Sequence, residues 1–308
     1  MKIIRGLHNI RPEHKGSVIT IGNFDGVHLG HQMLINETIA AARELALPST
    51  LITFEPQPRE YFRGNTVPAR LTRFREKITL INQLGIDQVV CLEFNERTAS
   101  IPAEVVIAEL LVNRLGVRHL IVGDDFRFGR GARGDSTLLR QAGEKHGFKV
   151  RCMSTKTHGD ERLSSSQVRA ALEAGDFSLA ESLLGRPYFI MGRVSYGRQL
   201  GRQLGSPTAN IRLQRYRAAL NGVFAVTVNG LDKRYLGVAN IGIRPTVDGK
   251  EPLLEVHIFD FDEDIYGELL TVTFHAKIRE EKKFDGLDAL KTQIGADIVT
   301  AKNLLVDV

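Results

Sequence analysis

Two histidines, His28 and His31, stand three residues apart directly behind a glycine-rich segment. Residues 17–21 predict a short buried strand, and apolar residues recur at helical spacing after position 32, so residues 22–30 are expected to form the turn between strand and helix. Glycines let a backbone approach a phosphate closely, and a helix N-terminus offers unpaired N–H groups to an anion. Two imidazoles at this spacing would share one helix face. The pattern therefore predicts a phosphate-handling site.

A His-x-x-His pair also occurs in ordinary capped turns and as half of a metal site. Zinc requires three or four close ligands, whereas Cys91 and Cys152 lie in separate apolar runs without a Cys-x-x-Cys partner. We therefore expect no zinc centre. The histidines alone leave the capped turn open.

The whole string Gly-Asn-Phe-Asp-Gly-Val-His-Leu-Gly-His, residues 22–31, resembles the signature of the His-x-Gly-His nucleotidyltransferases. Its first five residues resemble the version in prokaryotic bifunctional riboflavin kinase/FAD synthetases. The resemblance implies adenylyl transfer: the phosphate of FMN attacks the α-phosphorus of ATP, and pyrophosphate leaves without a covalent enzyme intermediate. His28 and His31 would then stabilise charge on the phosphates, and Asn23 would orient phosphate oxygens. The other turn residues assigned to the nucleotide are Gly22, Asp25 and Gly30.

Composition fits such an enzyme. The 308 residues suggest two domains, 43% of them are hydrophobic and 25% charged, and no apolar run approaches the length of about 18 residues that a membrane span needs. The N-terminus lacks the apolar segment of a signal peptide, and two scattered cysteines predict the reducing cytoplasm. The net charge of +5 is dispersed and there is no Trp, which favours phosphorylated small molecules over nucleic acid as partners.

Strand and helix patterns alternate in the first half of the chain. Strands are predicted at residues 50–54, 88–94, 119–123 and 149–153, and helices at 72–84, 102–115 and 135–146, the last capped by Asp135 or Ser136. This alternation predicts a Rossmann-like parallel sheet. Ligands of such sheets bind beyond the carboxyl ends of the strands, where the 22–30 turn and residues 55–58 and 123–129 would converge.

Residues 54–58 and 123–129 also resemble family motifs, which implies contacts with the flavin. The residues so assigned are Phe54, Pro56, Pro58, Asp125, Phe126 and Phe128. Phe126 and Phe128 could equally be core anchors. Gln57 stands where relatives commonly carry His.

A serine run, residues 164–166, precedes the helical pattern 168–174. Serines before a helix are usually N-caps, and Arg169 is expected in the first helical turn, where a cation opposes the helix dipole unless an anion is bound. The run resembles the family's triphosphate motif, with Ser166 where Thr is usual. The resemblance assigns the phosphates to Arg162, Ser164, Ser165 and Arg169, with the last three holding the leaving pyrophosphate.

The pattern changes near residues 184–188, which predicts domains of residues 1–185 and 186–308. The second half reads as strands at 189–194, 223–228, 235–241, 253–259 and 270–274, with turn signals at 229–230 and 248–249. Such spacing predicts an antiparallel barrel. An amphipathic helix over 287–305, capped by Asp285, would cover it.

Spaced glycines mark residues 192–205, and in a β protein they usually indicate bulges and turns. Followed by Pro-Thr-Ala-Asn, they resemble the flavokinase motif instead, which assigns Gly192, Gly197, Gly201 and Gly205 to nucleotide phosphates and Thr208 and Asn210 to Mg²⁺. Neutral oxygens bind Mg²⁺ weakly, so the phosphates of ATP would complete its shell. The chain contains no P-loop motif.

Residues 237–246 and 254–258 also resemble flavokinase motifs, which assigns Asn240 and Arg244 to the flavin and makes Glu255 the candidate base for the ribityl hydroxyl. Strand alternation places Glu255 and His257 opposite Leu254, Val256 and Ile258. The polar face could be the barrel exterior or a site.

The two motif sets together predict a cytoplasmic bifunctional enzyme of FAD biosynthesis, with riboflavin, FMN and ATP as substrates and Mg²⁺ as cofactor. A riboflavin kinase whose N-terminal half is impaired through Gln57 and Ser166 is one alternative. A non-catalytic flavin- or RNA-binding regulator is the other. The sequence leaves open whether the protein forms a homo-oligomer.

Overall fold

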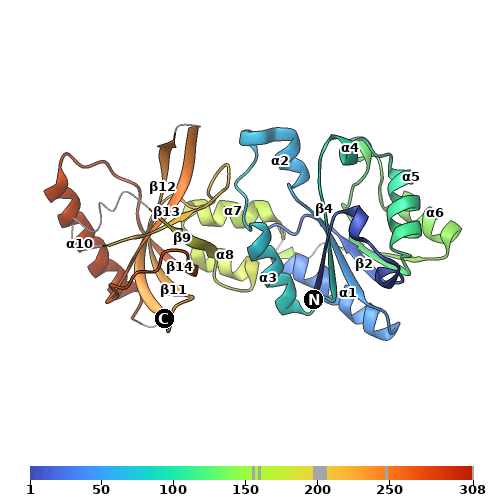
Figure 1. Ribbon diagram of the computed structural model, residues 1–308, viewed down its shortest axis with the longest axis horizontal. Helices are drawn as coiled ribbons and strands as arrows, with labels where there is room; N and C mark the ends of the chain where they lie inside the picture. The colour runs from blue at the N-terminus through green and yellow to red at the C-terminus, as the bar shows by residue number, and fades with distance from the viewer. Residues whose placement is uncertain (155–156, 159–160, 197–206, 247–248, 307–308) are drawn as a thin grey trace. The chain divides into compact units, whose positions relative to one another are not determined.

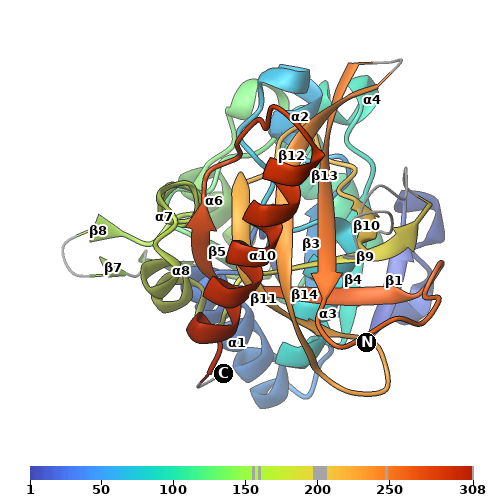
Figure 2. The ribbon, with the colours of Figure 1, turned by 90° about the vertical axis from the view of Figure 1, so that its left-hand side faces the viewer.

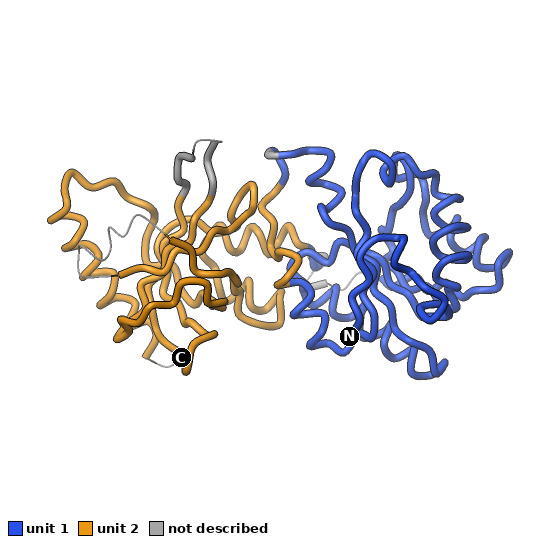
Figure 3. Tube along the Cα trace, in the orientation of Figure 1, with its two compact units in different colours: residues 1–67, 77–164 blue, residues 68–76, 165–308 orange. Residues whose placement is uncertain are grey.

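The computed structural model describes the chain except for residues 155–156, 159–160, 197–206, 247–248 and 307–308. Contacts divide it into two compact units, which Figure 3 distinguishes by colour. Residues 1–67 and 77–164 form the first unit, and residues 68–76 and 165–308 form the second. No helix among the described residues has the length and apolarity to cross a membrane.

The first unit contains the predicted parallel sheet, with six strands in the order β1-β4-β3-β2-β5-β6 (Figure 1). The strands are β1 (Lys2–Arg5), β2 (Val18–Ile21), β3 (Ser49–Phe54), β4 (Gln88–Leu92), β5 (His119–Gly123) and β6 (Lys149–Met153). Every neighbouring pair is parallel. The sequence analysis did not predict β1, because a four-residue edge strand with two apolar residues gives almost no pattern.

Helices cover both faces of this sheet. The helix α1 (Leu29–Glu44) packs on Val18 and Ile121, whereas a π-helix, η4 (Val106–Arg114), and α6 (Ser136–His146) share a core with the alternate residues Ile19 and Leu120. Asp135 caps α6 through the N–H of Leu138, 2.9 Å away, as predicted. The predicted helix over 102–115 is instead a short α5 (Ala103–Val105) continued by η4. The remaining elements are η1 (Leu7–Asn9), η2 (Pro12–His14), α2 (Pro58–Arg63), η3 (Gly64–Thr66), α4 (Glu96–Ala99), η5 (Arg130–Ala132), β7 (Thr157–His158) and β8 (Glu161–Arg162); α3 (Phe74–Leu84) contributes residues to both units.

The second unit contains the predicted antiparallel barrel, closed in the order β10-β13-β12-β11-β14-β9. Its strands are β9 (Phe189–Ser195), β10 (Ala209–Arg212), β11 (Gly222–Asn229), β12 (Tyr235–Thr246), β13 (Gly249–Ile258) and β14 (Leu269–Arg279). Fully buried side chains such as Phe224, Val256 and Phe274 fill its interior. The four-residue strand β10 was not predicted. Asn229 ends β11 as its turn signal indicated, whereas residue 248, in the other signal, lies outside the described residues.

The predicted C-terminal helix is α10 (Leu287–Leu304), which crosses the barrel surface in Figure 2. Ala301 and Leu305 pack against Ala225 and Phe259. The predicted cap Asp285 was wrong: Gly286 occupies the N-cap position with an extended backbone and no side-chain hydrogen bond. This leaves the first turn of α10 without the capping oxygen that the sequence analysis expected.

The second unit also holds α7 (Ser165–Ala174), α8 (Phe177–Leu184) and residues 68–76. A buried ion pair anchors the latter segment, since the Nη2 atom of Arg215 lies 2.8 Å and 2.5 Å from the two carboxylate oxygens of Glu76. Contacts therefore group residues 165–184 with the barrel, whereas the predicted boundary at residue 185 follows the change in sequence pattern. The division of the two activities at that residue stays a prediction.

Candidate active sites

The glycine-rich turn lies where predicted, between β2 and α1. His28 occupies the N-cap position of α1, and its Nδ1 atom accepts a hydrogen bond from the N–H of His31 at 3.4 Å. The two imidazoles stack with their centroids 3.7 Å apart and their planes 20° from parallel. Gly30 leaves room for the His28 ring, because a Cβ atom there would lie only 3.1 Å from it, a tighter contact than is usual. The helix begins at Leu29, so the turn is slightly shorter than predicted.

A lysine that the sequence analysis did not select lies beside this turn. Lys77, on α3, is fully buried, and its Nζ atom donates to the Oγ1 atom of Thr53 at 3.3 Å. The Thr53 hydroxyl in turn donates to the backbone oxygen of Asn23 at 3.4 Å. Burial, the neighbouring His28 and the charge of Lys77 hold the pKa of His31 well below its usual range. His31 is therefore neutral near pH 7.

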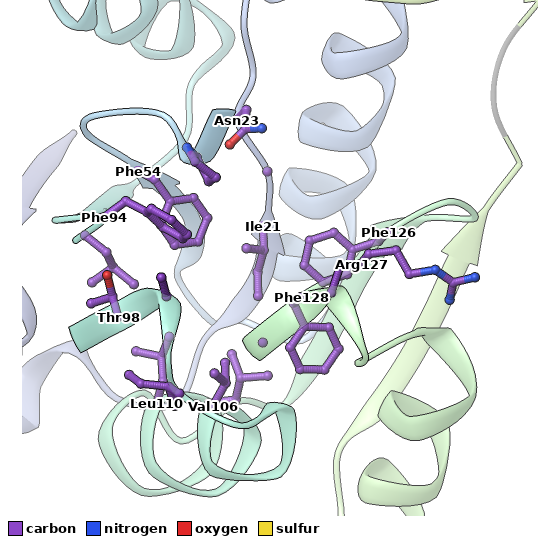
Figure 4. A pocket seen from close by; sticks show the side chains of 18 of the residues that line it. Ile21, Asn23, Phe54, Phe94, Thr98, Val106, Leu110, Phe126, Arg127 and Phe128 are labelled. Carbon is purple, nitrogen blue, oxygen red and sulfur yellow. The ribbon is translucent and has the colours of Figure 1, made fainter. Parts of the chain in front are cut away.

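A cavity of about 650 Å³ opens beside the turn, at the carboxyl end of the sheet. Figure 4 shows Phe54 and Phe94 on one side and Phe126 and Phe128 on the other, with Asn23 at the edge. Phe126 and Phe128 stack with their planes 13° from parallel, and both also pack on the core. They are therefore core anchors and pocket walls at once. The predicted residues that line the cavity are Gly22, Asn23, Phe54, Pro58, Asp125, Phe126 and Phe128, and Pro56 is not among its lining residues.

Several cavity residues escaped the sequence analysis. Phe62 on α2, Phe94 after β4 and Val106 and Leu110 on η4 all contribute to the wall. Phe54, Tyr61, Phe62 and Phe94 form a cluster of edge-to-face aromatic contacts, with centroids 5.2 Å to 5.8 Å apart. The adjacent aromatic residues 61 and 62 were the available signal in the sequence. In the structure Phe62 is 67% exposed on the short helix α2.

The serine run differs from its prediction. The helix α7 begins at Ser165, so Arg169 is its fifth residue. The sequence predicted Arg169 in the first turn, whereas it lies beyond that turn. Ser165 and Ser166 are the first two residues of α7, which moves the helix start toward the N-terminus, and Ser164 directly precedes the helix. The Nε atom of Arg169 donates to the backbone oxygen of Ala69. Ser166, the departure from the family pattern, is exposed, and the side chain of Arg162 lies outside the described residues.

The other departure, Gln57, is a buried residue at the N-cap position of α2. Its backbone N–H donates to the Oε2 atom of Glu60 at 2.8 Å. Its Nε2 atom is buried and has no hydrogen-bond partner within the described part of the chain. The backbone of Gln57 thus supports the start of α2, whereas its side-chain Nε2 atom gains no hydrogen bond there from the described residues.

On the barrel, strand register brings three predicted residues into one row. Glu255 on β13 stands directly opposite Asn210 on β10 and Asn240 on β12. Directly opposed residues project from the same side of a sheet, so the three side chains share a face. Val238, two residues from Asn240, packs with the α10 cluster, which identifies this face as the barrel exterior. The polar face of β13 therefore lies on the barrel exterior, and its role as a site stays a prediction.

The row offers oxygen ligands. The Oδ1 atoms of Asn210 and Asn240 are both buried and have no hydrogen-bond partner among the described residues, and the Nδ2 atom of Asn210 donates to the backbone oxygen of Thr208 at 3.2 Å. Mg²⁺ prefers a few amide or carboxylate oxygens together with substrate phosphates. The described residues contain no group of three or more His, Cys, Asp or Glu that could hold a metal by themselves. The residues present therefore fit a magnesium ion that arrives with a nucleotide.

Gly192 projects into the barrel interior instead. A Cβ atom there would lie 2.2 Å from the Cγ2 atom of Ile211, so packing between β9 and β10 also requires a glycine, and its contact with nucleotide phosphates stays a prediction. Gly197, Gly201, Gly205 and the side chain of Arg244 lie outside the described residues.

Comparison with known proteins assigns the two parts of the chain to two enzyme families. A family model for FAD synthetase matches residues 10–167, and one for riboflavin kinase matches residues 184–305. A bifunctional riboflavin kinase/FMN adenylyltransferase from Pseudomonas fluorescens is 52% identical over 306 residues, which cover 99% of this chain and 98% of the relative. The chain belongs to the bifunctional riboflavin kinase/FMN adenylyltransferase family.

A second family member agrees with this assignment, and one solved structure has a similar fold over nearly the whole chain. The family member from Escherichia coli K12 is 48% identical, with 98% of this chain and 97% of the relative covered. A crystal structure described as a macrolide-efflux protein from Streptococcus pneumoniae is similar over 98% of this chain and 99% of its own, with a TM-score of 0.82 and 29% identity. In this bifunctional family member, the cavity and the histidine turn fall within the FAD synthetase match, and the Asn210–Glu255–Asn240 row falls within the riboflavin kinase match.

Proposed function

We propose that the protein phosphorylates riboflavin with ATP to give FMN and then adenylylates FMN with a second ATP to give FAD and pyrophosphate. The observation that carries this proposal is the presence of two separate polar constellations, each inside the corresponding family match. One is the stacked His28–His31 turn beside an aromatic cavity. The other is the row of Asn210, Glu255 and Asn240.

In adenylyl transfer, the flavin of FMN would occupy the aromatic cavity with its phosphate toward Asn23. An oxygen of that phosphate attacks the α-phosphorus of ATP, and the bond to the β-phosphate breaks as pyrophosphate leaves. Negative charge builds on the transferring phosphate, and the imidazoles of His28 and His31, at the N-terminus of α1, would stabilise it. Gly22, Asp25, Gly30, Arg162, Ser164, Ser165 and Arg169 are the further residues proposed to bind the nucleotide.

In the kinase reaction, Glu255 would take the proton of the ribityl hydroxyl as its oxygen attacks the γ-phosphorus and ADP leaves. Thr208 and the unpartnered oxygen of Asn210 would hold the Mg²⁺, which neutralises charge on the phosphates of ATP. Asn240, next to Glu255 in the row, would orient the flavin substrate. Arg244 and the glycines at 197, 201 and 205 are proposed to bind flavin and phosphates respectively.

We further propose that the two activities divide near residue 185 and that the enzyme works in the cytoplasm. The alternative, a kinase whose N-terminal half is impaired through Gln57 and Ser166, predicts FMN without FAD.

Incubation of the purified protein with riboflavin, ATP and Mg²⁺, followed by chromatography of the flavins over time, tests the proposal. We expect FMN to appear first and FAD to follow. FMN without FAD would contradict the adenylylation step, and the absence of both products would overturn the proposal.

A further inference from the structure

A fully buried lysine in the first unit has no role in the proposed chemistry. Lys77 is 0% exposed, on the face of α3 that also carries the buried residues Leu80 and Ile81. Burying an ammonium group costs several kcal/mol unless it is hydrogen-bonded or paired, so the groups that contact Lys77 must offset this cost.

A chain of two hydrogen bonds links Lys77 to the glycine-rich turn before α1. Its Nζ atom donates to Thr53, the penultimate residue of β3, and Thr53 donates to the backbone oxygen of Asn23. A threonine hydroxyl has a single proton, so accepting from Lys77 orients that proton toward the Asn23 oxygen. The lysine thereby fixes the turn at the residue that faces the cavity.

Lys77 also acts on His31 through its charge. The groups that shift the titration of His31 are His28, from the N-cap of α1, and Lys77, from α3; the buried carboxyl group of Asp25 belongs to the same turn. The Nδ1 atom of His31 is buried and lacks a hydrogen-bond partner in the described residues. Protonation of His31 would place a positive charge near that of Lys77 and near a protonated His28, and like charges repel.

We propose that Lys77 is a positioning residue for adenylyl transfer, which fixes the Asn23 turn through Thr53. This inference rests on the proposed adenylyltransferase function. Lys77 acts through Thr53 and His31, so its removal should lower the rate of the chemical step more than the binding of FMN.

The test compares the pH profiles of FAD formation from FMN and ATP in Lys77→Met, Lys77→Arg and Thr53→Val. Lys77→Met should lower kcat about 100-fold with little change in KM. Because the positive charge of Lys77 lowers the pKa of His31, its loss lets that pKa rise, and the acidic limb of the profile should move to higher pH. Lys77→Arg keeps the charge and should leave the limb in place. Thr53→Val removes only the relay and should lower kcat without moving the limb.

Controls separate the possible failures. Lys145→Met, at an exposed position of α6, should match the wild type, and riboflavin kinase activity in every preparation should be unchanged. If the wild type makes no FAD, the proposed function fails. If the wild type is active but Lys77→Met retains its rate and its acidic limb, or if Lys77→Met and Lys77→Arg lose the same activity with no movement of the limb, this inference alone is overturned.

If Lys77→Met does not fold, Thr53→Val and Lys77→Arg carry the test. A Thr53→Val enzyme with wild-type kcat would overturn the relay. NMR titration of the histidine rings in the ligand-free protein then gives the charge effect directly. His31 in the wild type should stay neutral to a pH well below the usual pKa range of histidine, and titration of His31 within that range would overturn the charge effect.

Discussion

The two candidate sites differ in how the fold assembles them. In the parallel sheet, Asn23, Phe54 and Phe126 come from segments at the ends of β2, β3 and β5, which are far apart in the sequence. In the barrel, Asn210, Glu255 and Asn240 lie within strands and meet because they are in register. The first site depends on strand order and the second on strand pairing. Because the two sites share no residue, a single substitution should affect one reaction and spare the other.

The sites also differ in their polarity. The first combines stacked imidazoles and a buried lysine with an aromatic cavity, which suits the stabilisation of charge on a transferring phosphate beside a flat ring. The second presents a carboxylate between two amide oxygens, which suits proton removal and metal binding. This contrast predicts which activity each substitution removes.

The largest effect is expected for Glu255→Gln. Loss of the base should lower kcat for FMN formation about 1000-fold, whereas FAD formation from added FMN should stay at the wild-type rate. Separate assays of the two reactions measure this split. Glu263→Gln, on an exposed loop, is the matched control. Equal loss of both activities would contradict the assignment of Glu255 to the kinase reaction alone.

His28→Ala is the reciprocal change. Removing this imidazole should lower the rate of FAD formation about 100-fold, because charge on the transferring phosphate loses a stabilising group. FMN should accumulate at the normal rate. His146→Ala, at the exposed end of α6, is the control. A His28→Ala enzyme that makes FAD within about threefold of the wild-type rate would remove His28 from the site.

Asn210→Ala tests whether Asn210 is a ligand of Mg²⁺ in the kinase reaction. Loss of its unpartnered oxygen should raise the Mg²⁺ concentration for half-maximal kinase activity about 10-fold, since one ligand is missing. A Mg²⁺ titration at saturating ATP measures the change, with Asn229→Ala at the exposed end of β11 as control. An unchanged Mg²⁺ requirement would argue against Asn210 as a ligand.

The smallest effect is expected for Phe62→Ala, in the cavity wall. Loss of one aromatic contact should raise KM for FMN in adenylyl transfer about fivefold with little change in kcat. Tyr216→Ala, an exposed aromatic residue of the second unit, serves as the control. A lower kcat with unchanged KM would show that Phe62 affects the chemistry and not the flavin pocket.

Much of this arrangement was predictable from the sequence. The turn before α1, the alternating strands and the barrel each follow from periodicity that buried faces impose on the chain. The Asn210–Glu255–Asn240 row was only partly predictable, because alternation fixes a residue's face but not its partner on the next strand.

The features that sequence patterns missed have local physical causes. The short strands β1 and β10 carry too few residues to show a period. The cap of α10 and the position of Arg169 depend on where a helix starts, which shifts by a few residues at little energetic cost. Lys77 was hidden because a lysine on a helix normally lies in solvent; its signal was its place on the apolar face with Leu80 and Ile81.

Complementation between two inactive variants tests the central claim that one chain carries two independent sites. Glu255→Gln and His28→Ala proteins are mixed with riboflavin, ATP and Mg²⁺, and FAD is measured. Each variant alone should make almost no FAD, whereas the mixture should make it readily, because FMN from the His28→Ala protein can diffuse to the intact adenylylation site of the other. A mixture that makes no more FAD than the separate variants would contradict two independent sites.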